Sequence, residues 1–157
     1  MLPVHVAVER LDVRCALSAM RVERIARLVL RAEKVTAGLL SITFVDGRKI
    51  ARINREHLGH HGPTDVISFA FVPTPGAGLV GDVYICPAVV AEHARRRAIG
   101  VREELARVVV HGTLHVVGWE HPDGDDAERI ASPMWRRQEA LLRRCRRVWR
   151  TASTGSA

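Results

Sequence analysis

Three histidines have a spacing that suits a single metal ion. His111 and His115 are four residues apart in an apolar segment, so on a helix their imidazoles lie one turn apart on the same face. Gly118 can end that helix because glycine adopts positive φ values at little steric cost, and the turn can bring His121 back to the same ion. Three neutral imidazoles leave zinc with an open position, as in catalytic sites. The sequence therefore predicts one metal ion held by these three side chains, with the open position of a catalytic zinc site.

The same spacing, with histidines at 0, +4 and +10 and a glycine at +7, is also that of the metzincin proteases. Those enzymes place a glutamate directly after the first histidine as the general base, whereas this chain has Gly112. A glycine cannot move a proton, so a peptidase of that mechanism would lack its base. The pattern favours a different hydrolysis.

The whole segment from His111 to His121, HGTLHVVGWEH, resembles the H-G-x-L-H-L-x-G-Y-D-H signature of the YbeY family of bacterial rRNA maturation factors, which are metal-dependent, single-strand-specific endoribonucleases. Two upstream segments are similar to other blocks of that family. Asn54-Arg55-Glu56 followed by PTDVISF (63–69) matches N-R-x…P-T-D-V-L-S-F, and GDVYICP (81–87) matches G-D-I-x-I-x-P. The three blocks and the segments between them, roughly Ile53 to His121, cover about half of the chain. Trp119 and Glu120 depart from the Tyr and Asp of the signature.

The resemblance implies roles for particular residues. The family's three metal-binding histidines fall on His111, His115 and His121, and its functionally important arginine falls on Arg55. A guanidinium there can neutralise the charge that develops on a phosphodiester in the transition state. The resemblance further implies one zinc ion, a compact α+β fold, and a role in 16S rRNA 3′-end maturation and ribosome quality control. Single-stranded RNA, the 16S rRNA precursor and the ribosome or its small subunit are the expected partners, with no membrane and no DNA.

Two other functions fit the same residues. One is a ribosome-associated RNA-binding factor whose metal is structural, and the other is a metal hydrolase that acts on a non-RNA substrate, including a peptidase whose base lies elsewhere. Around the expected ion, Glu120 and Asp123 flank His121, and either carboxylate could accept an N–H from a ligand imidazole. His57, His60 and His61 are expected on a surface loop.

The pattern of apolar residues predicts the elements that position these groups. Four strands are expected at Val4–Val8, Leu39–Val45, Val66–Val72 and Asp82–Cys86, with a Pro/Gly-rich turn at 73–78. About five helices are expected: Arg14–Lys34, one capped by Asp46 that ends at Gly59, one from Pro87 to Gly100, Val101–Val117, and a last helix from Asp123–Asp126 toward Val148. This order predicts an α+β fold, a small mixed sheet covered by helices, in a single domain (1–149) with a frayed tail (150–157).

Length and composition agree with such a domain. The 157 residues contain only three cysteines, Cys15, Cys86 and Cys145, far apart in the chain, which predicts a reducing cytoplasm and no disulfide framework. No run approaches the ~18 apolar residues of a membrane span. The formal net charge of +7 comes almost wholly from arginine and permits a polyanionic partner. Two arginine-rich segments, 95–97 and 143–147, could supply phosphate contacts if they share a face with the metal site.

Overall fold

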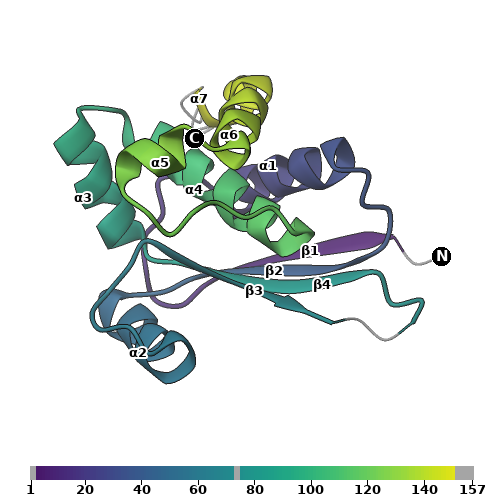
Figure 1. The fold of residues 1–157 in the computed structure, drawn as a ribbon, viewed down its shortest axis with the longest axis horizontal. Coiled ribbons are helices and arrows are strands. Elements are labelled where there is room, and N and C mark those ends of the chain that lie inside the picture. The colour runs from purple at the N-terminus through teal and green to yellow at the C-terminus, as the bar shows by residue number, and fades with distance from the viewer. Residues whose placement is uncertain (1–2, 73–74, 151–157) are drawn as a thin grey trace, which may run out of the picture.

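A four-stranded sheet with helices on both faces forms the protein (Figure 1). The computed structural model describes residues 3–72 and 75–150, and all counts below refer to these. The elements in chain order are β1 (Val4–Arg10), α1 (Ala19–Ala32), β2 (Gly38–Phe44), α2 (Gly47–Leu58), β3 (Val66–Phe71), β4 (Leu79–Ile85), α3 (Pro87–Arg97), α4 (Val101–Val117), α5 (Asp126–Ile130), α6 (Pro133–Arg144) and α7 (Arg146–Arg150). The predicted α+β class and four-stranded mixed sheet are confirmed.

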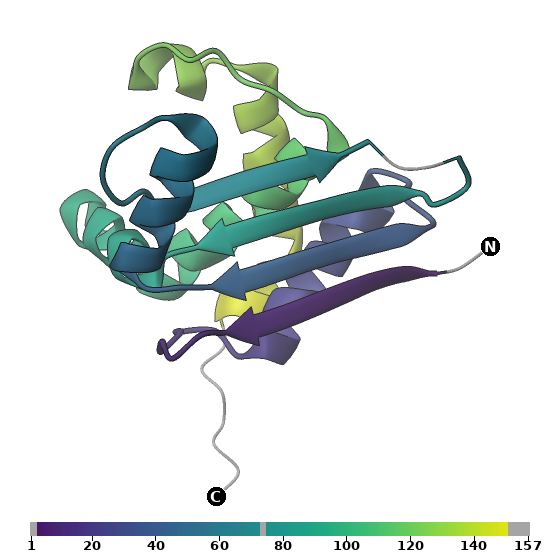
Figure 2. The same cartoon turned by 90° about the horizontal axis from the view of Figure 1, so that it is seen from below.

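The sheet has the strand order β1-β2-β4-β3. The β1–β2 and β2–β4 pairs are parallel, and β3 runs antiparallel to β4 at the edge. Helices α1, α4 and α6 lie on one face, and α2 lies on the other. Seen from below, α2 crosses one end of the strands, and the rest of that face carries no helix among the described residues (Figure 2).

Alternation along the strands decides which side chains enter the core. Leu40, Ile42 and Phe44 of β2 are buried, while the residues between them are partly exposed. The buried side chains pack with the apolar faces of α1 and α4 into one core. A smaller cluster, which includes Ile50 and Ile53, lies under α2.

Helix α4 is the most deeply buried helix and comes unusually close to the sheet. A Cβ atom placed on Gly112 would lie 2.7 Å from Cγ1 of Val83 on β4, and one on Gly81 would clash with the side chain of Val116. The Ser68 hydroxyl on β3 donates a hydrogen bond to the Gly112 carbonyl at 3.1 Å. The glycine after the first histidine is therefore a packing requirement, and this position has no room for a carboxylate side chain.

The C-terminal region differs from the expected single helix. Three helices, α5 to α7, replace it, so the described chain has seven helices where about five were predicted. Ser132 caps α6, since its Oγ accepts from the backbone N–H of Trp135 at 3.2 Å, and Pro133 occupies the first turn. A proline suits this position because it has no N–H to leave unpaired. Helix α1 likewise begins at Ala19 instead of Arg14, because Ser18 caps it.

Other expectations fall partly outside the described residues. Helix α7 ends at Arg150, so the predicted tail lies outside the described residues except for Arg150, as do positions 73 and 74 of the predicted turn. All three cysteines are free thiols. Among the described helices, none has the length and apolar character needed to cross a membrane.

Replacing Gly112 by alanine tests the close packing of α4. The added methyl group meets Val83, so we expect the free energy of unfolding to fall by about 1–3 kcal/mol in urea titrations. Gly47→Ala is the control, because a Cβ at Gly47 has no atom within 4 Å. It should leave stability unchanged or raise it by up to about 1 kcal/mol. Equal midpoints for Gly112→Ala and the wild type would show that α4 does not approach the sheet this closely.

Candidate metal centre

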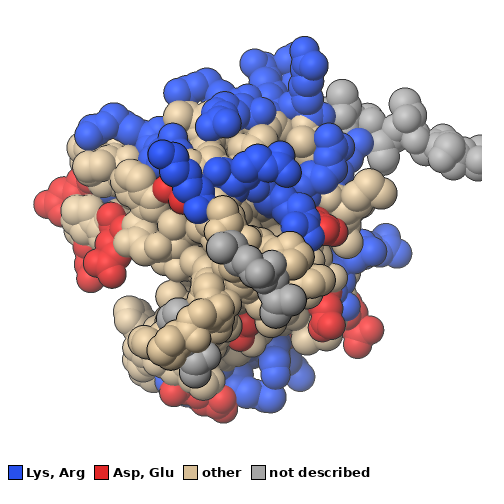
Figure 3. Space-filling model, turned by 90° about the vertical axis from the view of Figure 1, so that its right-hand side faces the viewer, with Lys and Arg blue, Asp and Glu red and all other residues tan. Residues whose placement is uncertain are grey.

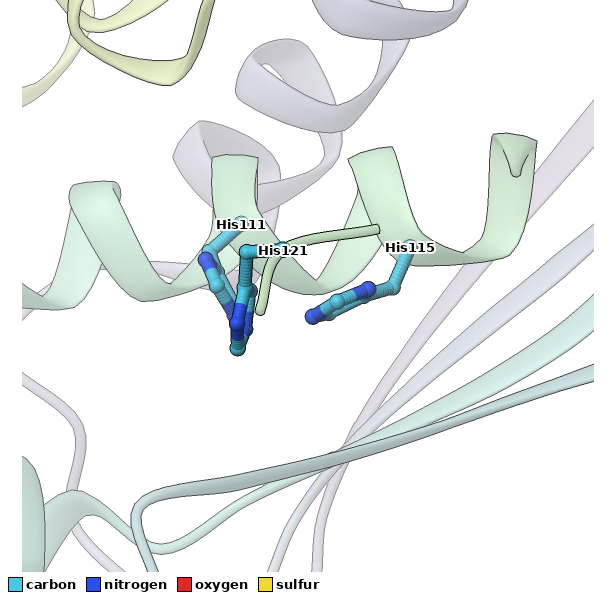
Figure 4. A group of neighbouring side chains, drawn as sticks. All are labelled: His111, His115 and His121. Carbon is cyan, nitrogen blue, oxygen red and sulfur yellow. The ribbon is translucent and has the colours of Figure 1, made fainter. Parts of the chain in front are cut away.

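The fold brings the three predicted histidines together (Figure 4). His111 and His115 project from successive turns of α4, and His121 faces them from the segment after the helix. One ring nitrogen of each lies within 4.8 Å of those of the other two, and the ring centroids are 4.5–5.2 Å apart. No fourth His, Cys, Asp or Glu of the described residues joins the group. The three side chains are half-buried, so one side of the cluster stays accessible to solvent.

The turn that returns His121 depends on Gly118. Its φ of 123° is in the region that favours glycine, and its N–H donates to the carbonyls of Leu114 and His115. The next residue, Trp119, fixes the turn against α1, since its indole N–H donates to Glu33 Oε2 at 3.1 Å. Arg137 of α6 binds the other carboxylate oxygen of Glu33 at 2.7 Å. The turn is thus tied to two helices beside α4.

Each imidazole makes a hydrogen bond through Nδ1. The partners are Gln138 Oε1 at 2.6 Å for His111, the Trp119 carbonyl at 2.9 Å for His115 and the Pro122 carbonyl at 2.9 Å for His121. A carbonyl oxygen only accepts, so each Nδ1 carries the proton and donates. The lone pair of every Nε2 is then left free to bind a metal. Neither Glu120 nor Asp123 is the acceptor for any of the three rings.

Gln138 is the part of the site that the sequence did not reveal. It is 1% exposed, and its Nε2 donates to Glu139 Oε2 at 3.2 Å. Because a carboxylate accepts but does not donate, the amide oxygen must face His111. Gln138 lies 27 residues from His111 in the chain, and nothing in the arginine-rich sequence around it indicates this contact.

A network of ion pairs that includes the buried Glu104 continues from Gln138. Arg107 binds Glu139 at 3.0 Å and Glu104 at 2.8 Å, and Glu104 also pairs with Arg97 at 3.3 Å. Burial alone would lower the pKa of Arg107, but hydrogen bonds and charge from Glu139 and Glu104 raise it overall. The guanidinium therefore remains charged and holds Glu139 in place beside Gln138.

The electrostatics of the cluster favour the neutral form of His111 and His115. Burial is the main cause that lowers the pKa of His111 to about 4, and the neighbouring His115 lowers it further. Burial also lowers the pKa of His115, with a contribution from His121. A neutral imidazole is the form that binds a metal. His111 and His115 are thus in the form required for metal binding at neutral pH.

The other predicted residues lie away from the cluster. Arg55 is exposed in the last turn of α2, on the opposite face of the sheet from α4 (Figure 1). Among the described residues, no hydrogen bond or ion pair links it to the three histidines. His57 packs edge-on against Phe69 with ring centroids 5.5 Å apart, and His60 and His61 are exposed.

Comparisons with known proteins identify relatives of this chain. The family model described as Endoribonuclease YbeY matches residues 7–146. A relative named Endoribonuclease YbeY from Chlorobium phaeobacteroides (strain BS1) is 37% identical over 122 residues, 78% of this chain and 84% of that protein. One of the same name from Alteromonas mediterranea is 35% identical over 115 residues, 72% and 73% of the two chains. The solution structure of TM1509 from Thermotoga maritima shares the fold, with a TM-score of 0.62 at 22% identity over 98% of this chain and 100% of that one.

Substituting Gln138 tests its part in the centre. Gln138→Met keeps the length of the side chain but leaves the Nδ1–H of His111 without an acceptor, so we expect the affinity for Zn²⁺ to fall by about 10–100-fold. Competition with a chromophoric chelator measures this affinity. Arg136→Met, at an exposed position of the same helix, should bind zinc like the wild type. Undiminished affinity in Gln138→Met would contradict the assigned hydrogen bond.

Proposed function

This chain belongs to the endoribonuclease YbeY family, which makes it a nuclease and hence a hydrolase, and we propose that it is a zinc-dependent endoribonuclease that cleaves single-stranded RNA. The observation that carries this proposal is the convergence of three imidazoles, each with a free Nε2, on one point with no fourth ligand residue in the described chain. A structural zinc site commonly has four protein ligands. The three-histidine arrangement fits catalysis better.

The residues of this chain suit zinc and phosphodiester hydrolysis. When bound, zinc supplies a Lewis acid and an activated water near neutral pH. The imidazoles are held in the correct tautomer by Gln138 and two backbone carbonyls. Because Gly112 packs against Val83, the position directly after the first ligand cannot carry the glutamate base of a metzincin peptidase. That feature favours RNA over a peptide as the substrate.

A basic surface supports a polyanionic substrate. Figure 3 shows Lys and Arg side chains gathered over the upper part of one face, where α1 and α6 lie. Exposed arginines of these helices include Arg24, Arg31, Arg136, Arg143 and Arg144. The arginines of segment 95–97 are instead engaged in ion pairs within the protein. Arg95 and Arg96 bind Glu92, and Arg97 binds Glu104. RNA binding through the α1–α6 surface would weaken steeply with added salt.

The proposed biological role is 16S rRNA 3′-end maturation and ribosome quality control in the cytoplasm, with the 16S rRNA precursor and the small subunit or whole ribosome as partners. The sequence resemblance supports this role, and the basic surface and the free cysteines agree with it.

His121→Ala separates a catalytic metal from a structural one. His121 lies outside α4 and the core, so we expect the variant to fold like the wild type while cleavage of a labelled single-stranded RNA falls at least about 100-fold, because the metal contributes several kcal/mol to the transition state. His60→Ala, at an exposed loop position, is the control. If His121→Ala instead lowers the thermal stability of the zinc-loaded protein and cleavage per folded molecule persists, the metal is structural. Nuclease-free preparation is essential.

We also propose that Arg55 is catalytic and contacts the RNA. Since α2 leads into the edge strand β3, an RNA strand that reaches the metal centre past this edge can bring a phosphate to the Arg55 guanidinium. Arg55→Ala should then lower the cleavage rate by about 100-fold, or about 3 kcal/mol, at full metal occupancy. Arg52→Ala, one turn earlier and also exposed, should cleave like the wild type. Unchanged cleavage by Arg55→Ala would remove this residue from the mechanism.

A further inference from the structure

A cavity of about 260 Å³ opens beside one of the three histidines. His111 lines it, whereas His115 and His121 do not, so the cavity extends from one side of the metal centre. Its other walls include Asp65 before β3, His93 of α3, Arg129 of α5, and Trp135 and Gln138 of α6. It is at the small end of ligand pockets, which suits a single flat ring system and excludes a double helix.

Trp135 provides an aromatic wall. The side chain is half-buried, and the residue is fixed in the first turn of α6, where its backbone N–H donates to Ser132. Gln138 follows three residues later and lies on the same helical face, so the helix that orients His111 also presents the indole to the cavity. An indole beside a nucleic-acid cleft is a stacking surface for a base, whatever its sequence.

Arg129 provides a donor that the protein does not use. Its Nε is buried and has no hydrogen-bond partner among the described residues, and its Nη2 binds only the exposed carboxylate of Asp126 at 2.8 Å. The other two arginines of the cavity differ, since Arg97 and Arg107 are both paired with the buried Glu104. A buried donor without a partner is uncommon in proteins. A guanidinium with a free N–H is well suited to phosphate.

We propose that this cavity binds one unstacked nucleotide next to the scissile phosphate, with its base against Trp135 and its phosphate accepting from Arg129. Asp65 and His93, whose carboxylate and ring nitrogen are 3.6 Å apart, face the cavity as polar groups for the edge of the base. This assignment rests on the proposed function. It gives a physical reason for the preference of the proposed nuclease for single-stranded over double-stranded RNA. A base that enters the cavity cannot be paired, so a duplex must first open at that position.

Binding of a labelled oligouridylate to the full-length protein tests the assignment. Fluorescence anisotropy in the presence of a chelator measures affinity without consuming the probe. Trp135→Leu should weaken binding about tenfold, the loss of one stacked base, and Trp135→Phe should keep most of the affinity because it keeps a ring. Arg129→Gln should weaken binding about tenfold, whereas Arg48→Gln, which removes the same charge from an exposed position of α2, should not.

The same strand annealed to oligoadenylate is the second probe. The wild type and Trp135→Leu should bind this duplex equally weakly. The assignment is overturned if Trp135→Leu and Arg129→Gln bind the single strand as tightly as the wild type, or if Trp135→Phe loses as much affinity as Trp135→Leu. Thermal unfolding of each variant shows whether it folds. If Trp135→Leu does not fold, the affinity of Arg129→Gln for the single strand decides whether the assignment holds. Cleavage by the zinc-loaded wild type is measured separately, so its absence would refute the nuclease function and leave the binding result interpretable.

Discussion

The contact of α4 with the sheet sets the geometry on which the metal centre depends. The helix carries two of the three imidazoles, and the next residue after His111 packs so closely on β3 and β4 that a Cβ atom at Gly112 would clash with Val83. A buried helix packed at this distance cannot rotate or slide without losing core contacts. The backbone positions of His111 and His115 are therefore fixed, and the turn at Gly118 brings the ring of His121 to them.

Hydrogen bonds on the outer side of the rings then determine what the cluster can bind. All three Nδ1 atoms donate to oxygen, one to the Gln138 amide and two to backbone carbonyls. Two of these acceptors belong to the turn itself, so the path of the backbone orients the ligands. The third acceptor, the Gln138 amide, is connected through Glu139 to the half-buried charge of Arg107. Burial lowers the pKa of His111 and His115, and the neutral rings present their Nε2 lone pairs to a metal.

The local parts of this site are readable from the sequence, whereas the parts that depend on long-range packing are not. Helical spacing of His111 and His115 and a glycine before His121 suffice to predict that the rings meet. The four strands and the fold class follow from apolar alternation, and Ser132-Pro133 is a helix-start signal that could have revealed the break before α6. In contrast, Gln138 reaches His111 only because α6 packs on α4, and no spacing rule connects residues 27 positions apart. The same holds for the cavity formed by Trp135 and Arg129.

X-ray absorption at the zinc edge of the protein loaded with one equivalent of Zn²⁺ tests the central claim most directly. We predict a four-coordinate ion with three imidazole nitrogens at about 2.0–2.1 Å and one further oxygen from solvent. A coordination shell with sulfur, with four protein ligands, or with fewer than three imidazoles would contradict an open, three-histidine centre.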